Sequence, residues 1–175
     1  MKIADRIMLW VAEGFGAGRL RPAPGTWGSV VGILWLMLLL CAANAWVWLA
    51  GTLIGLALAV PICTRAERLL GAHDPSSVVL DEIAAVPLVW LGAVWIPGAF
   101  ASSGPLAPTA IAMAHAPELA TAFAAFRLFD IWKPGPIRAA QRLPDGLGVV
   151  ADDVLAALAA GAVVAVTAFL RRGAA

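Results

Sequence analysis

The sequence predicts an all-α protein: a polytopic membrane helix bundle of four to five spans, with an N-terminal amphipathic helix lying at the interface. Hydrophobic residues make up 62% of the 175 positions and charged residues only 13%, so lipid is the expected main surrounding of the chain. No charged residue occurs from Pro22 to Thr64, a run about twice the ~20 apolar residues of one crossing helix. We therefore expect one membrane-embedded domain over residues 1–175.

The uncharged run is expected to form two spans joined by a turn at residues 43–45. The first span lies near residues 29–41 and extends a few positions further, and the second lies near residues 46–63. Trp46 and Trp48 are predicted to anchor the second span at the membrane interface, where tryptophan is enriched.

Three further spans follow from the remaining apolar stretches. The third is predicted near residues 78–95, the fourth near 109–129 and the fifth near 154–170. His115 and Pro117 interrupt the fourth, which leaves the count between four and five spans.

Residues 1–27 are expected to form the interfacial helix and a loop beside the site, and residues 28–170 the helical bundle. Lys2 and Arg6 precede a short apolar stretch that Asp5 and Glu13 interrupt, so the segment does not resemble a secretory signal peptide.

The distribution of positive charge predicts the orientation of the bundle. Ten of the twelve Lys and Arg residues precede the last span, and the predicted crossings place them on one side. The positive-inside rule assigns that side to the cytoplasm. Arg171 and Arg172 disagree, unless the last helix stops short of the far interface or re-enters the membrane.

The net charge argues against a nucleic-acid-binding protein, and the positions of the cysteines and histidines argue against a metal site built from them. A net charge of +1 lacks the basic surplus of a nucleic-acid-binding protein. Cys41 and Cys63 lack the spacing of a metal site and are expected to be small buried hydrophobic residues. His73 and His115 likewise lack partners at metal-ligand spacing. The sequence carries no signal for an oligomeric state.

Four polar segments are predicted to meet at the same membrane face, although they lie far apart in the chain. They are GFGAGRLRPAPGTWGS (14–29), HDPSSVVLDE (73–82), FRLFDIWKPGPIR (126–138) and DGLGVVADD (145–153). Ionisable groups at a membrane edge are costly in lipid, so their side chains should face the bundle interior or water.

Acidic side chains in these segments predict a metal site. Asp81-Glu82 and Asp152-Asp153 are each expected to begin a helix, and Asp130 to end one. An alternative explanation for either pair alone is that the helix dipole favours negative charge at the start of a helix. Adjacent helical residues point about 100° apart, so only one of each pair is expected to face a common centre. Converging carboxylates repel unless a cation joins them, and hard oxygen ligands suit Mg²⁺.

Basic and hydroxyl side chains supply candidates for phosphate binding. Pro134 and Pro136 should end the helix after Asp130 and hold Lys133 and Arg138 nearby, although a loop that extends its cations to lipid headgroups is an alternative. Thr26 and Ser29 could cradle a phosphate at a helix start or serve only as an N-cap.

Together the four segments resemble the phosphatidylglycerophosphatase A family, with motifs in family order from Gly14 to Asp153. The resemblance implies Mg²⁺-dependent hydrolysis of phosphatidylglycerophosphate to phosphatidylglycerol and phosphate, at the cytoplasmic face of the bacterial inner membrane, in phospholipid synthesis. It places the family's acidic positions on Asp81, Glu82, Asp130, Asp152 and Asp153, and its basic positions on Lys133 and Arg138. The chain departs from the family pattern at Ala84-Ala85, Ala156-Ala157 and Pro144-Asp145, where glycines are usual.

The working hypothesis assigns metal binding to the five acidic residues, and catalysis to Glu82, Asp130 and Asp153, with Glu82 as general base. Lys133, Arg138, Thr26 and Ser29 would bind the substrate. A different metal-dependent lipid phosphotransferase is the alternative enzyme, which phosphate release without a second substrate would exclude. A small transporter or assembly factor is the alternative outside enzymes, and it predicts acidic groups at the bilayer midplane.

Overall fold

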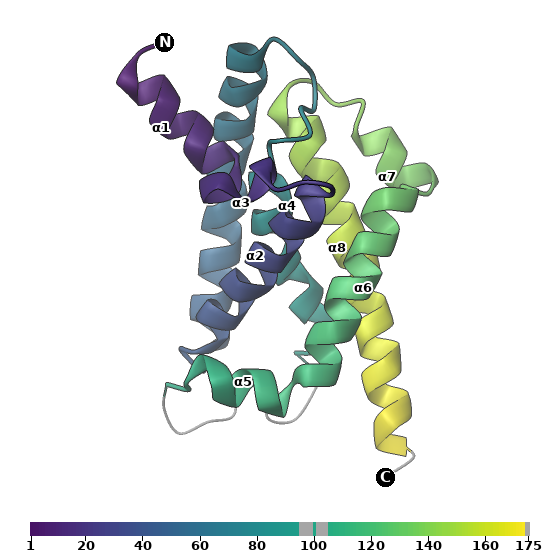
Figure 1. Ribbon diagram of the computed structural model, residues 1–175. Helices are drawn as coiled ribbons and strands as arrows, with labels where there is room; N and C mark the ends of the chain where they lie inside the picture. The colour runs from purple at the N-terminus through teal and green to yellow at the C-terminus, as the bar shows by residue number, and fades with distance from the viewer. Residues whose placement is uncertain (95–99, 101–104, 174–175) are drawn as a thin grey trace.

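The computed structural model describes residues 1–94, 100 and 105–173, and these residues form a bundle of helices (Figure 1), which confirms the all-α class. In chain order the elements are α1 (Ile3–Ala12), η1 (Gly14–Arg19), α2 (Pro24–Leu40), α3 (Ala45–Leu70), α4 (Leu80–Ala85), η2 (Val86–Gly92), α5 (Pro108–Ala114), α6 (Ala116–Trp132), α7 (Gly135–Ala140) and α8 (Gly146–Gly173), where η marks a 3₁₀ helix.

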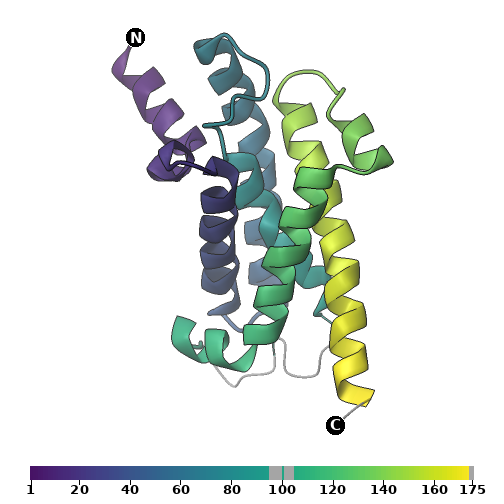
Figure 2. The ribbon, with the colours of Figure 1, turned by 45° about the vertical axis from the view of Figure 1, so that its right-hand side comes forward.

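The long helices stand side by side with alternating directions (Figure 1, Figure 2). α2 and α8 run away from the end where the N-terminus lies, whereas α3 and α6 run toward it. The start of α2, the start of α8 and the end of α6 therefore share one end of the bundle, and α4 lies between them.

Two helices in the described ranges are long and apolar enough to cross a membrane: α3 with 26 residues and α8 with 28. α2 is apolar but has only 17 residues. The four to five expected spans are thus represented by two candidate membrane-spanning helices.

The predicted third span is wrong as a single long helix. The chain forms six α-helical residues in α4 and then seven 3₁₀ residues in η2, beginning at Val86. Pro87 lacks an N–H, and its ring conflicts with the carbonyl four residues earlier, which explains the change of helix type. Val86 to Trp90 are all buried, so this segment is a core element of the protein. Residues 95–99, which include the end of the predicted span, lie outside the described residues.

The predicted fourth span is divided into α5 and α6 at His115. Pro117 is the second residue of α6 and cannot donate a hydrogen bond to the preceding turn, so the two helices do not merge. α5 lies across the far end of the bundle, at an angle to α6 (Figure 1).

The turn between the first two predicted spans is confirmed. The Asn44 side chain caps α3 by accepting hydrogen bonds from the N–H groups of Trp46 at 2.8 Å and Val47 at 3.3 Å. Trp48, predicted at the interface, is instead buried, and its indole N–H donates to the Pro87 carbonyl at 3.1 Å. Trp46 is exposed.

α1 forms a helix in the predicted N-terminal segment, and its placement at a membrane interface stays a prediction. Leu9 and Ala12 are buried against the bundle, and Asp5 pairs with Arg65 of α3 at 3.0 Å. α2 begins at Pro24, so the expected boundary between residues 27 and 28 falls within that helix. At the far end, Arg171 pairs with Glu118 of α6 at 3.0 Å, which gives this exceptional cation an acidic partner.

η2 packs on α8 through direct backbone contact between two glycines. A Cβ atom added to Gly92 would lie 1.8 Å from the carbonyl oxygen of Gly161. No side chain fits there, so glycine is required for the central segment to reach α8.

We predict that Gly92→Val lowers the free energy of unfolding by at least about 1–3 kcal/mol, the usual cost of overpacking a core. Gly135→Ala is the matched control, because its added Cβ meets nothing within 4 Å. Thermal unfolding in detergent measures both variants, and equal midpoints for the two would contradict the prediction.

Candidate active site

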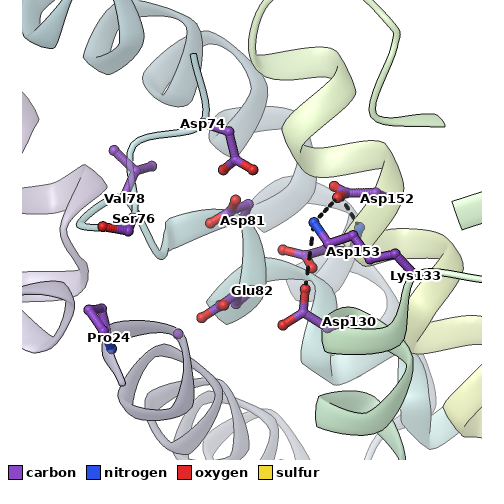
Figure 3. A pocket seen from close by; sticks show the side chains of 11 residues that line it. Pro24, Asp74, Ser76, Val78, Asp81, Glu82, Asp130, Lys133, Asp152 and Asp153 are labelled. Atoms are coloured by element: carbon purple, nitrogen blue, oxygen red, sulfur yellow. Dashed lines mark hydrogen bonds and ion pairs between the residues drawn. The ribbon is translucent and has the colours of Figure 1, made fainter. Parts of the chain in front are cut away.

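A polar cavity of about 160 Å³ lies where α2, α4, α6 and α8 meet (Figure 3). Six of its eleven lining residues are acidic, and they are Asp74, Asp81, Glu82, Asp130, Asp152 and Asp153. All five acidic residues that the sequence proposed are among them. The expected convergence of distant segments is thus present in the structure.

α4 contributes Asp81 and Glu82, which are only 4% and 9% exposed. Both line the cavity, although only one of the pair was expected to do so. The longer Glu82 side chain reaches α2, where a Cβ on Gly25 would lie 2.3 Å from its Oε1 and a Cβ on Gly28 would overlap its Oε2. The two glycines of α2 therefore make room for the Glu82 carboxylate.

α6 contributes Asp130 together with Arg127, for which no role was predicted from the sequence. Nη1 of Arg127 lies 2.6 Å from Asp130 Oδ2 and 3.1 Å from Glu82 Oε1. Arg127 and Asp130 are three positions apart on one face of α6, a spacing typical of ion pairs in helices. This spacing is the signal in the sequence that could have identified Arg127. Arg127 therefore links α6 to α4 through its ion pair with Glu82.

Lys133 caps the end of α6 in a left-handed conformation with φ of 45°. Its Nζ lies 2.5 Å from Asp152 Oδ2 and 3.9 Å from Asp130 Oδ1. Burial alone lowers the pKa of Lys133, but the hydrogen bond to Asp152 and the charges of Asp152, Asp130 and Asp153 outweigh it, so the pKa is raised. The Lys133 side chain is therefore a protonated ammonium group at neutral pH, and it faces the cavity.

Asp152 and Asp153 lie in the second turn of α8, because that helix begins at Gly146 rather than at the pair. The explanation that they only complement a helix start is therefore wrong. Both are nearly fully buried and both line the cavity. The Asp153 carboxylate makes no ion pair or hydrogen bond with the described part of the chain.

Asp74 also lines the cavity, from the loop between α3 and α4. It has a positive φ of 47°, its N–H donates to Glu67 Oε1 at 2.8 Å, and its Oδ2 accepts from Gln141 Nε2 at 2.9 Å. Asp74 belongs to one of the four predicted polar segments, but no role was predicted for it.

Of the four residues proposed to bind the substrate, only one lines the cavity. Lys133 lines the cavity, whereas Arg138 lies on the exposed side of α7 and does not line it. Ser29 is fully buried in the second turn of α2, donates to the Gly25 carbonyl at 2.9 Å and accepts from Arg127 at 3.4 Å. Thr26 is half-buried in the same helix and lies outside the cavity lining. Ala23 occupies the N-cap position of α2, so neither hydroxyl caps this helix.

Comparison with known proteins assigns the family. A model of the phosphatidylglycerophosphatase A family matches residues 10–168. The chain belongs to this family. A phosphatidylglycerophosphatase A from Haemophilus influenzae is 36% identical over 160 residues, covering 88% of this chain and 84% of the relative. One from Escherichia coli K12 is 28% identical over 148 residues, covering 83% and 74%.

A third relative, from Bacteroides thetaiotaomicron, carries the provisional name phosphatidylinositol-3-phosphatase. It is 32% identical over 167 residues, covering 89% of this chain and 90% of the relative. No solved structure matches the chain. The phosphatidylglycerophosphatase A family is a family of phosphatases, and the chain is therefore an enzyme of this kind.

Two of the three departures from the family pattern fall in the packed interior of this phosphatidylglycerophosphatase A homologue, whereas Pro144-Asp145 is exposed. Ala84, Ala85, Ala156 and Ala157 are all buried, with exposed fractions of 2% or less. Their methyl groups fill space beside the acidic pairs without entering the cavity lining.

The donor set of the cavity fits a divalent cation. Asp81 Oδ1 and Glu82 Oε2 are buried without hydrogen-bond partners, and buried charged oxygens are costly unless paired. Arg127 and Lys133 occupy oxygens of Asp130, Asp152 and Glu82, which leaves an excess of negative charge. Within the described residues no three acidic, histidine or cysteine side chains already stand in a metal-binding arrangement. Mg²⁺ therefore remains a proposal.

We predict that Arg127→Gln lowers the free energy of unfolding by about 3–5 kcal/mol, because it leaves Glu82 and Asp130 buried without their shared cation. Arg127→Lys should cost less, since one nitrogen makes the contacts to both carboxylates. Arg142→Gln is the matched control, because Arg142 is exposed and lines no cavity described above. Denaturant unfolding in detergent measures all three, and equal stability of Arg127→Gln and the control would exclude this role for Arg127.

Lys133 also predicts a pH dependence of stability. Because the pKa of Lys133 is raised in the folded state, its contribution to stability is complete below its ordinary pKa of 10.5 and is lost as pH rises through the higher folded value. Thermal midpoints measured between pH 8 and 12 should fall in the wild type once the pH exceeds about 10.5, and should fall less in Lys133→Gln. The chain contains no tyrosine, so few other groups titrate there. Parallel curves for the two proteins would refute this prediction.

Proposed function

We propose that the protein is an Mg²⁺-dependent phosphatase that hydrolyses phosphatidylglycerophosphate to phosphatidylglycerol and inorganic phosphate in phospholipid biosynthesis. The observation that carries this proposal is the single cavity in which acidic residues of α4, α6 and α8 meet Lys133. Acidic groups able to hold a cation, beside a fixed ammonium group, suit a phosphate ester better than a neutral substrate.

Different carboxylates take different parts in this proposal. Asp81 and Asp153, whose oxygens are least engaged by protein cations, would hold the Mg²⁺ ion together with Glu82. When bound, the ion would neutralise phosphate charge and increase the acidity of a water molecule. Glu82 would accept the proton of the attacking water, because its Oε2 has no partner among the described groups. Lys133 would contact the phosphate as a point charge.

Asp130 and Asp152 act in this scheme by positioning the basic side chains with which they pair. Asp130 contacts both Arg127 and Lys133, and Asp152 contacts Lys133. They orient the Arg127 and Lys133 side chains beside the acidic groups. Arg138 and Thr26 could contact the substrate only outside the cavity as it is lined here.

An apolar groove of about 400 Å³ supports a lipid substrate. It lies between α2 and α3 and is closed by Leu80 and Ile83 of α4, the helix whose other face carries Asp81 and Glu82. One short helix thus separates an apolar surface from the acidic cavity. We propose that acyl chains lie along the apolar side while the headgroup enters the cavity.

The proposed location is the bacterial inner membrane, with the cavity at the cytoplasmic face and four to five segments crossing or entering the bilayer. The basic residues of α1, η1, α7 and the end of α3 lie at the cavity end of the bundle (Figure 1), as the positive-inside rule requires of a cytoplasmic end. The acidic cavity is lined by the start of α2, the end of α6 and the early turns of α8, which lie toward this end (Figure 1), and this favours an enzyme over a transporter with groups at the midplane.

The testing experiment measures phosphate release by the purified protein from phosphatidylglycerophosphate in detergent micelles, with Mg²⁺ and with a chelator. We expect release that needs Mg²⁺ and no second substrate. Phosphatidylinositol-3-phosphate is included because one relative carries that activity in its name. Release from this lipid alone, or from neither lipid, would refute the proposed substrate.

We predict that Asp81→Asn lowers phosphate release by at least about 100-fold, comparable to the loss of one preorganised charged contact. The same change should maintain or raise thermal stability, because it removes one of several repelling buried carboxylates. Asp145→Asn is the matched control, since Asp145 is exposed, pairs with Arg68 at 3.2 Å and does not line the cavity. Full activity of Asp81→Asn would exclude the assigned role of Asp81.

A further inference from the structure

A second polar cavity, of about 420 Å³, adjoins the acidic one. It is lined by Arg19 at the end of η1, by Arg21 of the segment that follows, by Ser76 and Ser77 of the loop before α4, and by Pro24. Pro24 and Ser76 line both cavities, so the two are neighbours. In Figure 3 these two residues stand on the side of the acidic cavity opposite Lys133.

The charge of the second cavity is opposite to that of the first. Its lining holds two arginines and two serines and no acidic residue. Guanidinium and hydroxyl groups together are typical of sites that bind phosphate oxygens. A molecule that extended from one cavity to the other would meet first a carboxylate cluster and then a cationic one.

The arginine loop is held in place by specific contacts. Nε and Nη2 of Arg19 both donate to Glu13 Oε2, at 2.8 and 2.5 Å. A Cβ on Gly18 would lie 2.0 Å from the Ser77 carbonyl oxygen, so only glycine lets the η1 loop approach the serine loop this closely. Arg21 is exposed and forms no ion pair or hydrogen bond with the described residues. Arg21 is thus available to a ligand at no cost in internal contacts.

We propose that this basic cavity binds the phosphodiester of the lipid headgroup, so that the enzyme holds its substrate at two phosphates. The proposal rests on the proposed function, in which the terminal phosphomonoester occupies the acidic cavity. The glycerol between the two phosphates would then pass between Pro24 and Ser76. This arrangement would distinguish a headgroup that carries two phosphates from one that carries a single phosphomonoester.

The first test measures binding rather than activity. Short-chain dihexanoyl phosphatidylglycerol, which has the phosphodiester but no phosphomonoester, is titrated into purified protein in a maltoside detergent, and the thermal midpoint is followed. We expect Arg21→Gln to lower the affinity of the protein for this lipid by about tenfold or more, the usual effect of losing a charged hydrogen bond. Inorganic phosphate, the mimic of the phosphomonoester, should stabilise Arg21→Gln and the wild type alike.

Arg142→Gln removes the same charge from an exposed residue outside both cavities. It should bind the short-chain lipid as the wild type does, and Arg21→Lys should recover part of the lost affinity. Dihexanoylglycerol, which has no phosphate, should bind Arg21→Gln and the wild type equally. Equal binding of the short-chain phosphatidylglycerol by Arg21→Gln and Arg142→Gln would overturn the proposal.

The second test identifies the source of the phosphodiester. In detergent micelles whose sole phospholipid is phosphatidylglycerophosphate, Arg21→Gln should raise KM by about tenfold and leave kcat nearly unchanged, because the contact lies away from the reacting phosphate. Weaker binding of the short-chain lipid with an unchanged KM would assign the cavity to a neighbouring bilayer lipid and overturn the proposal. If the wild type releases no phosphate but Arg21→Gln still weakens phosphatidylglycerol binding, the proposed function fails and the phosphodiester site stands.

Discussion

Repulsion among buried carboxylates is the constraint on which the structure of the cavity depends. α4, α6 and α8 each bring acidic groups into one small space with little exposure to water. Arg127 and Lys133 compensate for part of this charge by contacts of 2.5 to 3.1 Å. The remaining excess of negative charge fits the divalent cation proposed above, which an anionic phosphate would need in order to enter the cavity.

The bundle keeps these groups together by burying the segment that carries the first acidic pair. η2 continues from α4 into the core, and its residues from Val86 to Trp90 are enclosed by neighbouring helices. Gly92 and Gly161 allow this segment to approach α8 at backbone distance. Apolar packing at one end of the segment thus holds Asp81 and Glu82 at the other.

Much of the fold followed from the sequence because charge and hydropathy act over whole segments. The uncharged run, its division before Asn44 and the helix that ends after Asp130 were all predictable. The third segment was not, since a hydropathy profile cannot distinguish a helix buried in protein from one exposed to lipid. The break at Pro87 distinguishes them only once the neighbouring helices are known.

The acidic side of the site was predictable because helix order alone places the polar segments at one end. Its pairings were not, because Arg127 meets Glu82 across 45 positions of sequence. The close fit of Glu82 against Gly25 of α2 has a consequence for motion. Since that carboxylate rests directly on the backbone of a neighbouring helix, any sliding or tilting of α2 is transmitted to it as a rigid displacement. The position of α2 is thereby linked to the alignment of the Glu82 carboxyl group in the cavity.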